Sequence, residues 1–181
     1  MTNKNKKRLD QEKIIVGDII KKFTMQPHPE GGWYTETYRS QGIHPNDFMQ
    51  QFPAGMNYST AIYYLLERGQ YSTFHKIKSD EMWHHYSGED LHIHCLDPQS
   101  GNYELKVLGS LYSANNNAQP QHWVPANVWF ASEPAPTAEY VLTGCTVSPG
   151  FNFSCFEIAK RQDLIRTFAE HTALITRLTQ T

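Results

Sequence analysis

Residues 69–88 read GQYSTFHKIKSDEMWHHYSG, and they carry the strongest indication of the fold. Successive side chains of a β-strand point to opposite faces, so His75 and Ile77 share one face of a strand. The polar run 78–80, Lys-Ser-Asp, predicts a chain reversal, after which Glu81 can return to that same face. The stretch therefore predicts two short strands that direct a histidine and a glutamate into one interior.

A second stretch, residues 125–130, reads PANVWF and supports the same architecture. Asparagine tolerates the left-handed backbone that turns often require, so Asn127 is compatible with a turn here. Phe130 follows on the next strand and carries no atom that can bind a metal.

Size and composition exclude several functional classes. The chain has 181 residues, enough for one domain with a sizeable core, and 16 basic against 18 acidic residues argue against a nucleic-acid partner. The longest apolar run, 61–66, is too short to cross a bilayer, and no apolar signal core follows the N-terminus. Three cysteines without CxxC spacing predict free thiols and a cytoplasmic location.

Short strands separated by turn residues fill most of the chain. This pattern predicts an antiparallel all-β fold. The expected strands are 33–39, 58–66, 71–77, 81–87, 91–96, 103–109, 121–125, 128–133, 139–147 and 152–157. On the first of them, alternation places Tyr34, Glu36 and Tyr38 on one face, and Arg39 on the other with Trp33, Thr35 and Thr37.

The remaining segments are predicted from composition and periodicity. Residues 1–9 are polar and basic and predict a disordered tail, which leaves 10–181 as a single domain. Helical spacing predicts a helix from Asp10 to before Pro27, packed on the outside of the barrel, and a second helix over 163–179. Residues 41–57 predict a long surface loop. The apolar stripes are Ile15, Ile19, Ile20 and Phe23, then Leu164, Phe168, Ile175 and Leu178.

Five segments together resemble the cupin-5 family of the cupin superfamily, a family of unknown function. They read PHPEGGWYTETYRS, STAIYYLL, HKIKSDEMWHHYSGEDL, VPANVWFAS and GCTVSPGFNF, and the resemblance runs over about 14–178. It implies a double-stranded β-helix, the cupin jelly roll, usually dimeric and enclosing a pocket. The fold is also similar to that of sugar-nucleotide 3,5-epimerases, although fold alone does not carry function. In both cupin motifs this chain departs from the metal-binding pattern, with Ile77 and Phe130 where those cupins have histidine, and Asn127 replaces a glycine.

The departures bear on a metal cofactor. A first-row metal needs three or four converging nitrogen or oxygen ligands, and the motif positions retain His75 and Glu81. His84, His85, His92 or His94 would have to complete the set, and the alternative for His92 and His94 is a solvent-facing strand edge. We therefore expect no cofactor, with a divalent metal on His75 and Glu81 as the minor alternative.

Acid–base chemistry requires no metal. His75 is the candidate base and Glu81 the group that orients it, with Tyr63 or Tyr38 as the acid. Arg39 is a candidate for binding a carboxylate or phosphate. The alternative is a buried polar pair that remains from an ancestral metal site.

Other residues are candidates for lining the pocket. They are Glu36, Trp83, His84, Trp129, Phe130, Phe151 and Phe153. Strict alternation turns His85 inward and His84 outward, whereas the family resemblance favours His84 unless a bulge intervenes. Cys145 lies in GCTVSPG without a base nearby in the sequence and is predicted to be a buried packing residue.

These inferences leave two classes of function open. The first is a metal-independent isomerase or epimerase of a small sugar-like or carbonyl compound, and the second is a non-catalytic small-molecule-binding protein. A metal-dependent cupin enzyme such as an oxygenase is a weaker third. We expect a small-molecule partner, no nucleic acid or membrane partner, and a homodimer formed through the edge strand near 33–39, which would otherwise be exposed.

Overall fold

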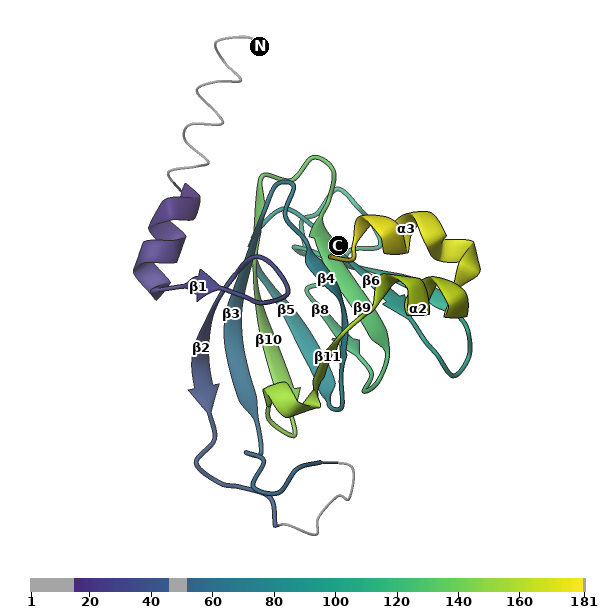
Figure 1. Ribbon diagram of the computed structural model, residues 1–181. Coiled ribbons are helices and arrows are strands. Elements are labelled where there is room, and N and C mark those ends of the chain that lie inside the picture. The colour runs from purple at the N-terminus through teal and green to yellow at the C-terminus, as the bar shows by residue number, and fades with distance from the viewer. Residues whose placement is uncertain (1–14, 46–51, 181) are drawn as a thin grey trace.

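Two antiparallel β-sheets face each other in the computed structural model, which describes residues 15–45 and 52–180 (Figure 1). The six-stranded sheet has the order β1-β2-β3-β10-β5-β8, and the five-stranded sheet has the order β11-β4-β9-β6-β7. The strands of the first sheet are β1 (Gln26–Pro27), β2 (Trp33–Arg39), β3 (Thr60–Glu67), β10 (Tyr140–Ser148), β5 (Asp80–Gly88) and β8 (Gln121–Val124). Those of the second are β11 (Phe156–Ile158), β4 (Ser72–Ile77), β9 (Trp129–Pro134), β6 (Leu91–Leu96) and β7 (Tyr103–Leu108). This arrangement confirms the predicted cupin jelly roll.

The predicted strands match those of the structure to within one or two residues, with one exception. The expected strand over 152–157 is wrong in its first part, where a 3₁₀ helix, η1 (Phe153–Cys155), precedes β11. The Asn152 side chain accepts a hydrogen bond from the backbone N–H of Ser154, and this local bond favours a helical turn over an extended strand. The turn at Asn127 is confirmed, with a left-handed φ of 65°.

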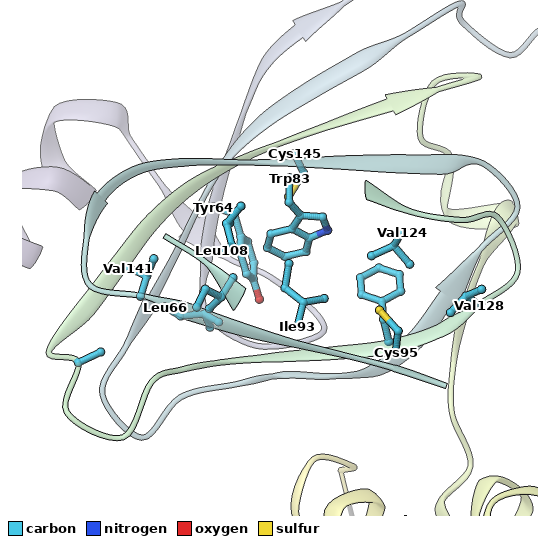
Figure 2. Close-up of a cluster of buried hydrophobic side chains, with 13 residues drawn as sticks. Tyr64, Leu66, Trp83, Ile93, Cys95, Leu108, Val124, Val128, Val141 and Cys145 are labelled. Carbon is cyan, nitrogen blue, oxygen red and sulfur yellow. The ribbon is translucent and has the colours of Figure 1, made fainter. Parts of the chain in front are cut away.

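The core lies between the two sheets (Figure 2). Trp83 on β5 is 1% exposed and packs with Tyr64 of β3 and Phe130 of β9. Alternation explains this placement, because Glu81 and Trp83 share the inner face of β5 while Met82 lies outside. Burial of these large side chains is the main stabilising contribution to the fold.

The first helix, over 15–23, packs on the outer face of the six-stranded sheet, as predicted. Its buried contacts come from Val16, with Ile19, Ile20 and Phe23 partly buried, whereas Ile15 of the predicted stripe is exposed. The predicted start at residue 10 and the predicted basic tail lie outside the described residues, as do residues 46–51 of the predicted loop. Within residues 15–45 and 52–180, no helix is long and apolar enough to cross a membrane.

The predicted C-terminal helix is interrupted. It consists of α2 (Arg161–Thr167), a 3₁₀ turn η2 (Ala169–His171) and α3 (Thr172–Arg177), because the backbone of Phe168 leaves the helical region. The predicted apolar stripe is nevertheless buried, against Phe74, Leu96 and Ala131 on the outer face of the five-stranded sheet. Figure 1 shows both helices beside this sheet.

A polar cluster fastens α3 to this sheet. His94 Nε2 lies 3.1 Å from Glu133 Oε1, and Arg177 pairs with the same carboxylate. His94 is buried on β6, which has neighbours on both sides, so the predicted solvent-facing edge for this histidine is wrong. Burial alone would raise the pKa of Glu133, but the bonds from His94 and Arg177 outweigh it and lower the pKa to about 2.

We expect Glu133→Gln to destabilise the protein at pH 7 by weakening this cluster. A depressed carboxyl pKa stabilises the fold above the unfolded value of 4.5, and that contribution disappears as the pH falls towards about 2. The difference in unfolding free energy between variant and wild type should therefore shrink between pH 5 and pH 2.5 in urea titrations. Glu104→Gln, which removes an exposed partner of Lys106, is the control with little effect. A Glu133→Gln deficit that stays constant with pH would contradict this account.

The β2 edge is partly covered. β1 pairs with Trp33 and Tyr34, while the remaining residues of β2 pair with β3 on one side. The homodimer expected through this edge stays a prediction.

Candidate functional site

A cavity of about 280 Å³ lies between the sheets, just below the range of about 300–1,000 Å³ that is usual for small-molecule sites. Its polar lining comprises His28, Glu30, Tyr34, Glu36, Arg39, Thr60, His75, Glu81, Cys145 and Asn152. Its apolar lining comprises Ile62, Ile77, Val147, Phe151 and Phe153. His75 and Ile77 from β4 and Glu81 from β5 therefore reach one interior, as their positions in the sequence predict.

His75 is held by two bonds. Its Nδ1 lies 2.7 Å from the carbonyl oxygen of Thr73, and its Nε2 lies 3.1 Å from Glu30 Oε2. The carboxylate that orients His75 is thus Glu30, whereas the prediction assigned this role to Glu81. Rings of Phe130 and Phe156 lie with centroids 4.0 and 5.3 Å from the imidazole and fix its plane.

Glu30 was missed because it comes from the loop between β1 and β2. The two residues that follow it, Gly31 and Gly32, have φ of 116° and 70°. A Cβ on Gly31 would lie 2.1 Å from the carbonyl oxygen of Tyr71. The loop therefore approaches the backbone of Tyr71 more closely than a residue with a side chain would allow. The sequence feature that could have identified Glu30 is its position in PHPEGG, as a charged residue directly before two glycines. His28, in the same loop, was also missed.

Burial determines the protonation of these groups. It lowers the pKa of His75 to about 4 and raises that of Glu30, although His28 partly opposes the shift at Glu30. It raises the pKa of Glu81 to about 8, and the nearby charge of Glu30 acts in the same direction. Burial also lowers the pKa of His28. At neutral pH the interior therefore favours neutral imidazoles and a protonated Glu81.

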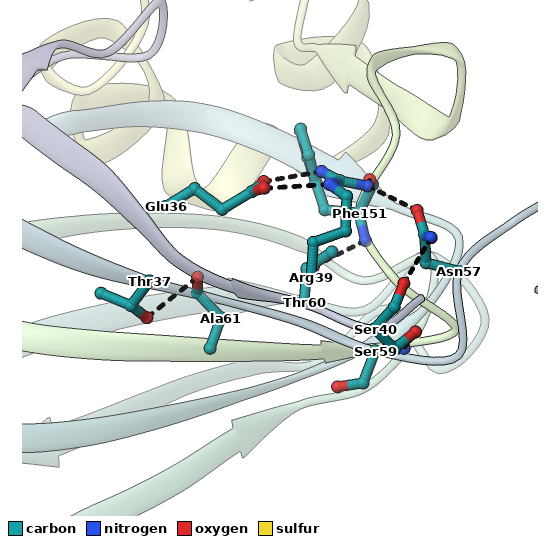
Figure 3. Close-up of polar contacts among 9 residues, drawn as sticks. All are labelled: Glu36, Thr37, Arg39, Ser40, Asn57, Ser59, Thr60, Ala61 and Phe151. Atoms are coloured by element: carbon teal, nitrogen blue, oxygen red, sulfur yellow. Dashed lines mark hydrogen bonds and ion pairs between the residues drawn. The ribbon is translucent and has the colours of Figure 1, made fainter. Parts of the chain in front are cut away.

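Arg39 makes four hydrogen bonds within the protein, several of which Figure 3 shows. Its Nε and Nη2 donate to the two carboxylate oxygens of Glu36, and its Nη1 donates to Asn57 and to the carbonyl of Phe151. This network joins β2 to the segment that carries Phe151 and Phe153. The guanidinium is thus already paired with the carboxylate of Glu36, and an anionic ligand would have to compete with this carboxylate for Arg39.

A bulge explains why β2 departs from strict alternation. The pairing with β3 shifts between Glu36 and Tyr38, so Thr37 is an extra residue. Arg39 consequently shares the cavity face with Tyr34 and Glu36, whereas Tyr38 is 54% exposed outside it. The predicted grouping of Tyr38 with Glu36 is wrong, and Tyr38 does not lie among the residues that line the cavity.

Several other candidates lie away from the cavity. Tyr63 is on the outer face of β3, where its ring packs against Phe23 and Tyr86. Trp129 lies outside the five-stranded sheet under Lys76, with a cation–ring distance of 4.3 Å. Trp83 belongs to the core (Figure 2).

The two neighbouring histidines on β5 follow alternation. His84 lies on the outer face, where its ring nitrogens contact Thr146 and Gln121 at 3.1 and 2.9 Å. The β5–β10 pairing shifts only after His85, too late to turn His84 inward. His85 contacts the carbonyl of Glu89, and neither histidine lines the cavity.

Phe130, Phe151, Phe153 and Cys145 lie where they can shape the site. Phe151 and Phe153 line the cavity, as predicted. Phe130 does not line it but packs against the ring of His75. Cys145 is buried and free, as are the other two cysteines. Burial keeps its pKa well above the ordinary thiol value, so it is a packing residue next to Glu81 rather than a nucleophile.

The residues at the motif positions differ from those of the metal-binding pattern. Hydrocarbon side chains, Ile77 and Phe130, replace two ligands of the metal-binding pattern, and the Nε2 of His75 is already engaged with Glu30. Over residues 15–45 and 52–180, no group of three or more His, Cys, Asp or Glu side chains is placed to hold a metal.

Comparison with known proteins identifies the family. The chain matches the family model described as "Cupin superfamily (DUF985)" over residues 17–159. It is 32% identical to a Shewanella oneidensis protein of solved structure, with a TM-score of 0.78 and coverage of 90% of this chain and 96% of that one. It is 30% identical to a hypothetical protein from Leishmania major, with a TM-score of 0.79 and coverage of 90% and 97%.

More distant structures share the fold alone. Oxalate decarboxylase from Bacillus subtilis is 11% identical with a TM-score of 0.52, over 86% of this chain and 37% of that one. No curated protein matches the chain. The family match and the two solved structures establish that the chain belongs to the cupin-5 family (DUF985) of the cupin superfamily.

Proposed function

We propose that the cavity binds a small, uncharged polar molecule and catalyses a metal-independent isomerisation or epimerisation of a sugar-like or carbonyl compound. The observation that carries this proposal is a buried acid–base constellation, Glu30, His75 and Glu81, in the lining of one small cavity. Proton transfer next to a carbonyl needs a base at the carbon and an acid at the oxygen. Glu81 supplies the acid, and the Glu30–His75 pair supplies the base.

The pKa of Glu81 supports its role as the acid. A carboxyl group with a pKa of about 8 is protonated at neutral pH and can donate to a carbonyl oxygen. Strongly perturbed carboxyl groups in a cavity are typical of catalytic sites.

The charge of the lining supports an uncharged ligand. Three glutamates, Glu30, Glu36 and Glu81, line the cavity, and its arginine, Arg39, is already bound to one of them. Burial keeps His28 and His75 neutral, so an anionic ligand would find no uncommitted cation among the described lining residues. The aromatic rings of Phe151 and Phe153 offer a surface on which the apolar face of a sugar can pack.

The test is deuterium exchange. The protein is incubated in D₂O with D-glyceraldehyde, D-xylose or D-fructose, and loss of the proton next to the carbonyl is followed by ¹H NMR. We expect Glu81→Gln to slow exchange about 100-fold or more, because a positioned acid contributes about 10²–10⁴-fold. Wild-type exchange should decline above pH 8, where Glu81 loses its proton.

Glu157→Gln is the matched control, since this exposed glutamate pairs with Lys76 outside the cavity. An unchanged rate in Glu81→Gln would contradict the assignment of Glu81 as the acid.

A non-catalytic binding protein is the second candidate. One observation favours it: both ring nitrogens of His75 already have partners within the protein, as in a mutually satisfied structural pair. Binding of these carbonyl compounds without deuterium exchange in the wild-type protein would identify this second function.

A further inference from the structure

We propose that Glu30 is the residue that exchanges a proton with the ligand, and that His75 is a positioning residue that never contacts the ligand through a ring nitrogen. This inference rests on the proposed function and identifies which atom of the Glu30–His75 pair is reactive. Its basis is the hydrogen-bond geometry of His75 and the position of Glu30 in the cavity wall.

The hydrogen bonds of His75 show where its protons lie. The Thr73 carbonyl oxygen can only accept, so Nδ1 of His75 carries a proton and donates it over 2.7 Å. On the other side, Nε2 lies 3.1 Å from Glu30 Oε2. A bare Nε2 and a bare carboxylate would both be acceptors, so one proton lies between them and is shared by the pair.

The ring nitrogens of His75 are not accessible to a ligand. Its side chain is 3% exposed, and both nitrogens are engaged. Phe130 and Phe156 pack against the ring, so it cannot turn without displacing them. A ligand in the cavity therefore has no nitrogen of His75 to bind, although the ring lies in the cavity wall.

The other carboxyl oxygen of Glu30, Oε1, makes no hydrogen bond with His28. Oε1 lies 3.7 Å from His28 Nδ1, which is too far for a hydrogen bond. His28 Nδ1 already accepts the backbone N–H of Glu30, so it has no proton to offer. The hydroxyl groups of Ser72 and Tyr64 also lie beside this carboxyl group, and both oppose the rise in the pKa of Glu30 that burial causes. Glu30 thus shares a proton with His75 through Oε2 and is itself one of the residues that line the cavity.

The proton balance follows. Oε1 of Glu30 takes the proton from the carbon next to the ligand carbonyl, and the shared proton moves fully onto Nε2 of His75. The C–H electron pair forms a C=C bond, and the carbonyl oxygen takes a proton from Glu81. The Glu30–His75 pair gains one positive charge and Glu81 one negative charge, so the enediol is neutral and the site stays neutral overall. The return of a proton to either face of the carbon, or to the neighbouring carbon, gives the epimer or the isomer.

The first experiment needs no ligand. The ¹⁵N NMR signals of the His75 ring are assigned by their loss in His75→Gln, and the tautomer is determined at neutral pH. We expect a proton on Nδ1 and, at Nε2, the signal of a nitrogen that accepts the proton shared with Glu30. A neutral ring protonated on Nε2 alone, the form that prevails in water, would overturn the proposal.

The second experiment separates the two roles in the deuterium-exchange assay. Glu30→Gln keeps the shape and offers an amide N–H to Nε2 but accepts no proton, so we expect exchange to fall about 100-fold or more while the tautomer of His75 is kept. His75→Gln leaves Glu30 in place, so we expect a loss of about 10-fold and a shifted pH profile. Equal activity of Glu30→Gln and wild type, or a larger loss in His75→Gln, would overturn the assignment.

Failure of the proposed function is distinguishable from failure of this inference. A wild-type protein that exchanges none of the three carbonyl compounds contradicts catalysis, whereas the tautomer alone decides where the proton lies. Circular dichroism of each variant confirms that the fold is intact.

Discussion

Gly88→Ala should destabilise the protein by roughly 3 kcal/mol or more, from a left-handed backbone penalty of about 1–2 kcal/mol and a steric penalty of similar size. Gly88 is the last residue of the segment 69–88, and its φ is 87°. A Cβ there would lie 2.2 Å from the carbonyl oxygen of Tyr140, which is backbone and cannot move aside as a side chain can. The clash lies at the β5–β10 junction, where Gly88 pairs with Val141. A fall in melting temperature of about 6–12 °C by calorimetry is expected.

Gly69→Ala is the matched control at the other end of the same stretch. Its φ is 80°, but nothing lies within 4 Å of a Cβ at this position. Only the backbone penalty remains, so we expect a loss of about 1–2 kcal/mol. Equal losses in the two variants would contradict the close approach of Tyr140 as the reason for glycine at residue 88.

The fold could be predicted because its signals are local. Alternation depends on neighbouring residues alone, and it correctly placed His75, Ile77 and Glu81 on one interior and Trp83 in the core. Turn chemistry is equally local, as the left-handed Asn127 shows. The break at Phe168 was missed because the apolar stripe continues through it, and periodicity reports which residues are buried rather than whether the helix is continuous.

The candidate site was less predictable because its geometry depends on contacts between distant segments. A single extra residue, Thr37, exchanges the faces of Tyr38 and Arg39, and only the pairing with β3 reveals it. Glu30 reaches His75 across 45 positions of sequence through a loop that two glycines allow to fold inward. Such contacts leave no periodic pattern. The sequence therefore identified the cavity but not the partner of its histidine.

The second large effect is expected at Phe130. Phe130→Ala should cost about 3–5 kcal/mol, the usual cost of removing a fully buried ring from a core. The ring is 1% exposed and lies between His75 and Trp83, with centroid distances of 4.0 and 6.3 Å. Urea unfolding measures the loss, and Phe153→Ala, at a ring that is 54% exposed, is the control with a loss below about 1 kcal/mol.

The same variant tests what the aromatic residue does for the site. Metal-binding cupins, by the resemblance of the motif, have a histidine at this position, whereas here the phenylalanine packs against the imidazole that a metal would otherwise engage. Without the ring, His75 gains freedom to turn, and we expect its Nδ1–H tautomer to give way to a mixture in the ¹⁵N spectrum. Phe130→Leu fills most of the space and should keep the tautomer, with an intermediate loss of stability. A Phe130→Ala variant that keeps one tautomer would show that Thr73, Glu30 and Phe156 hold the imidazole without Phe130, and that Phe130 serves only the core.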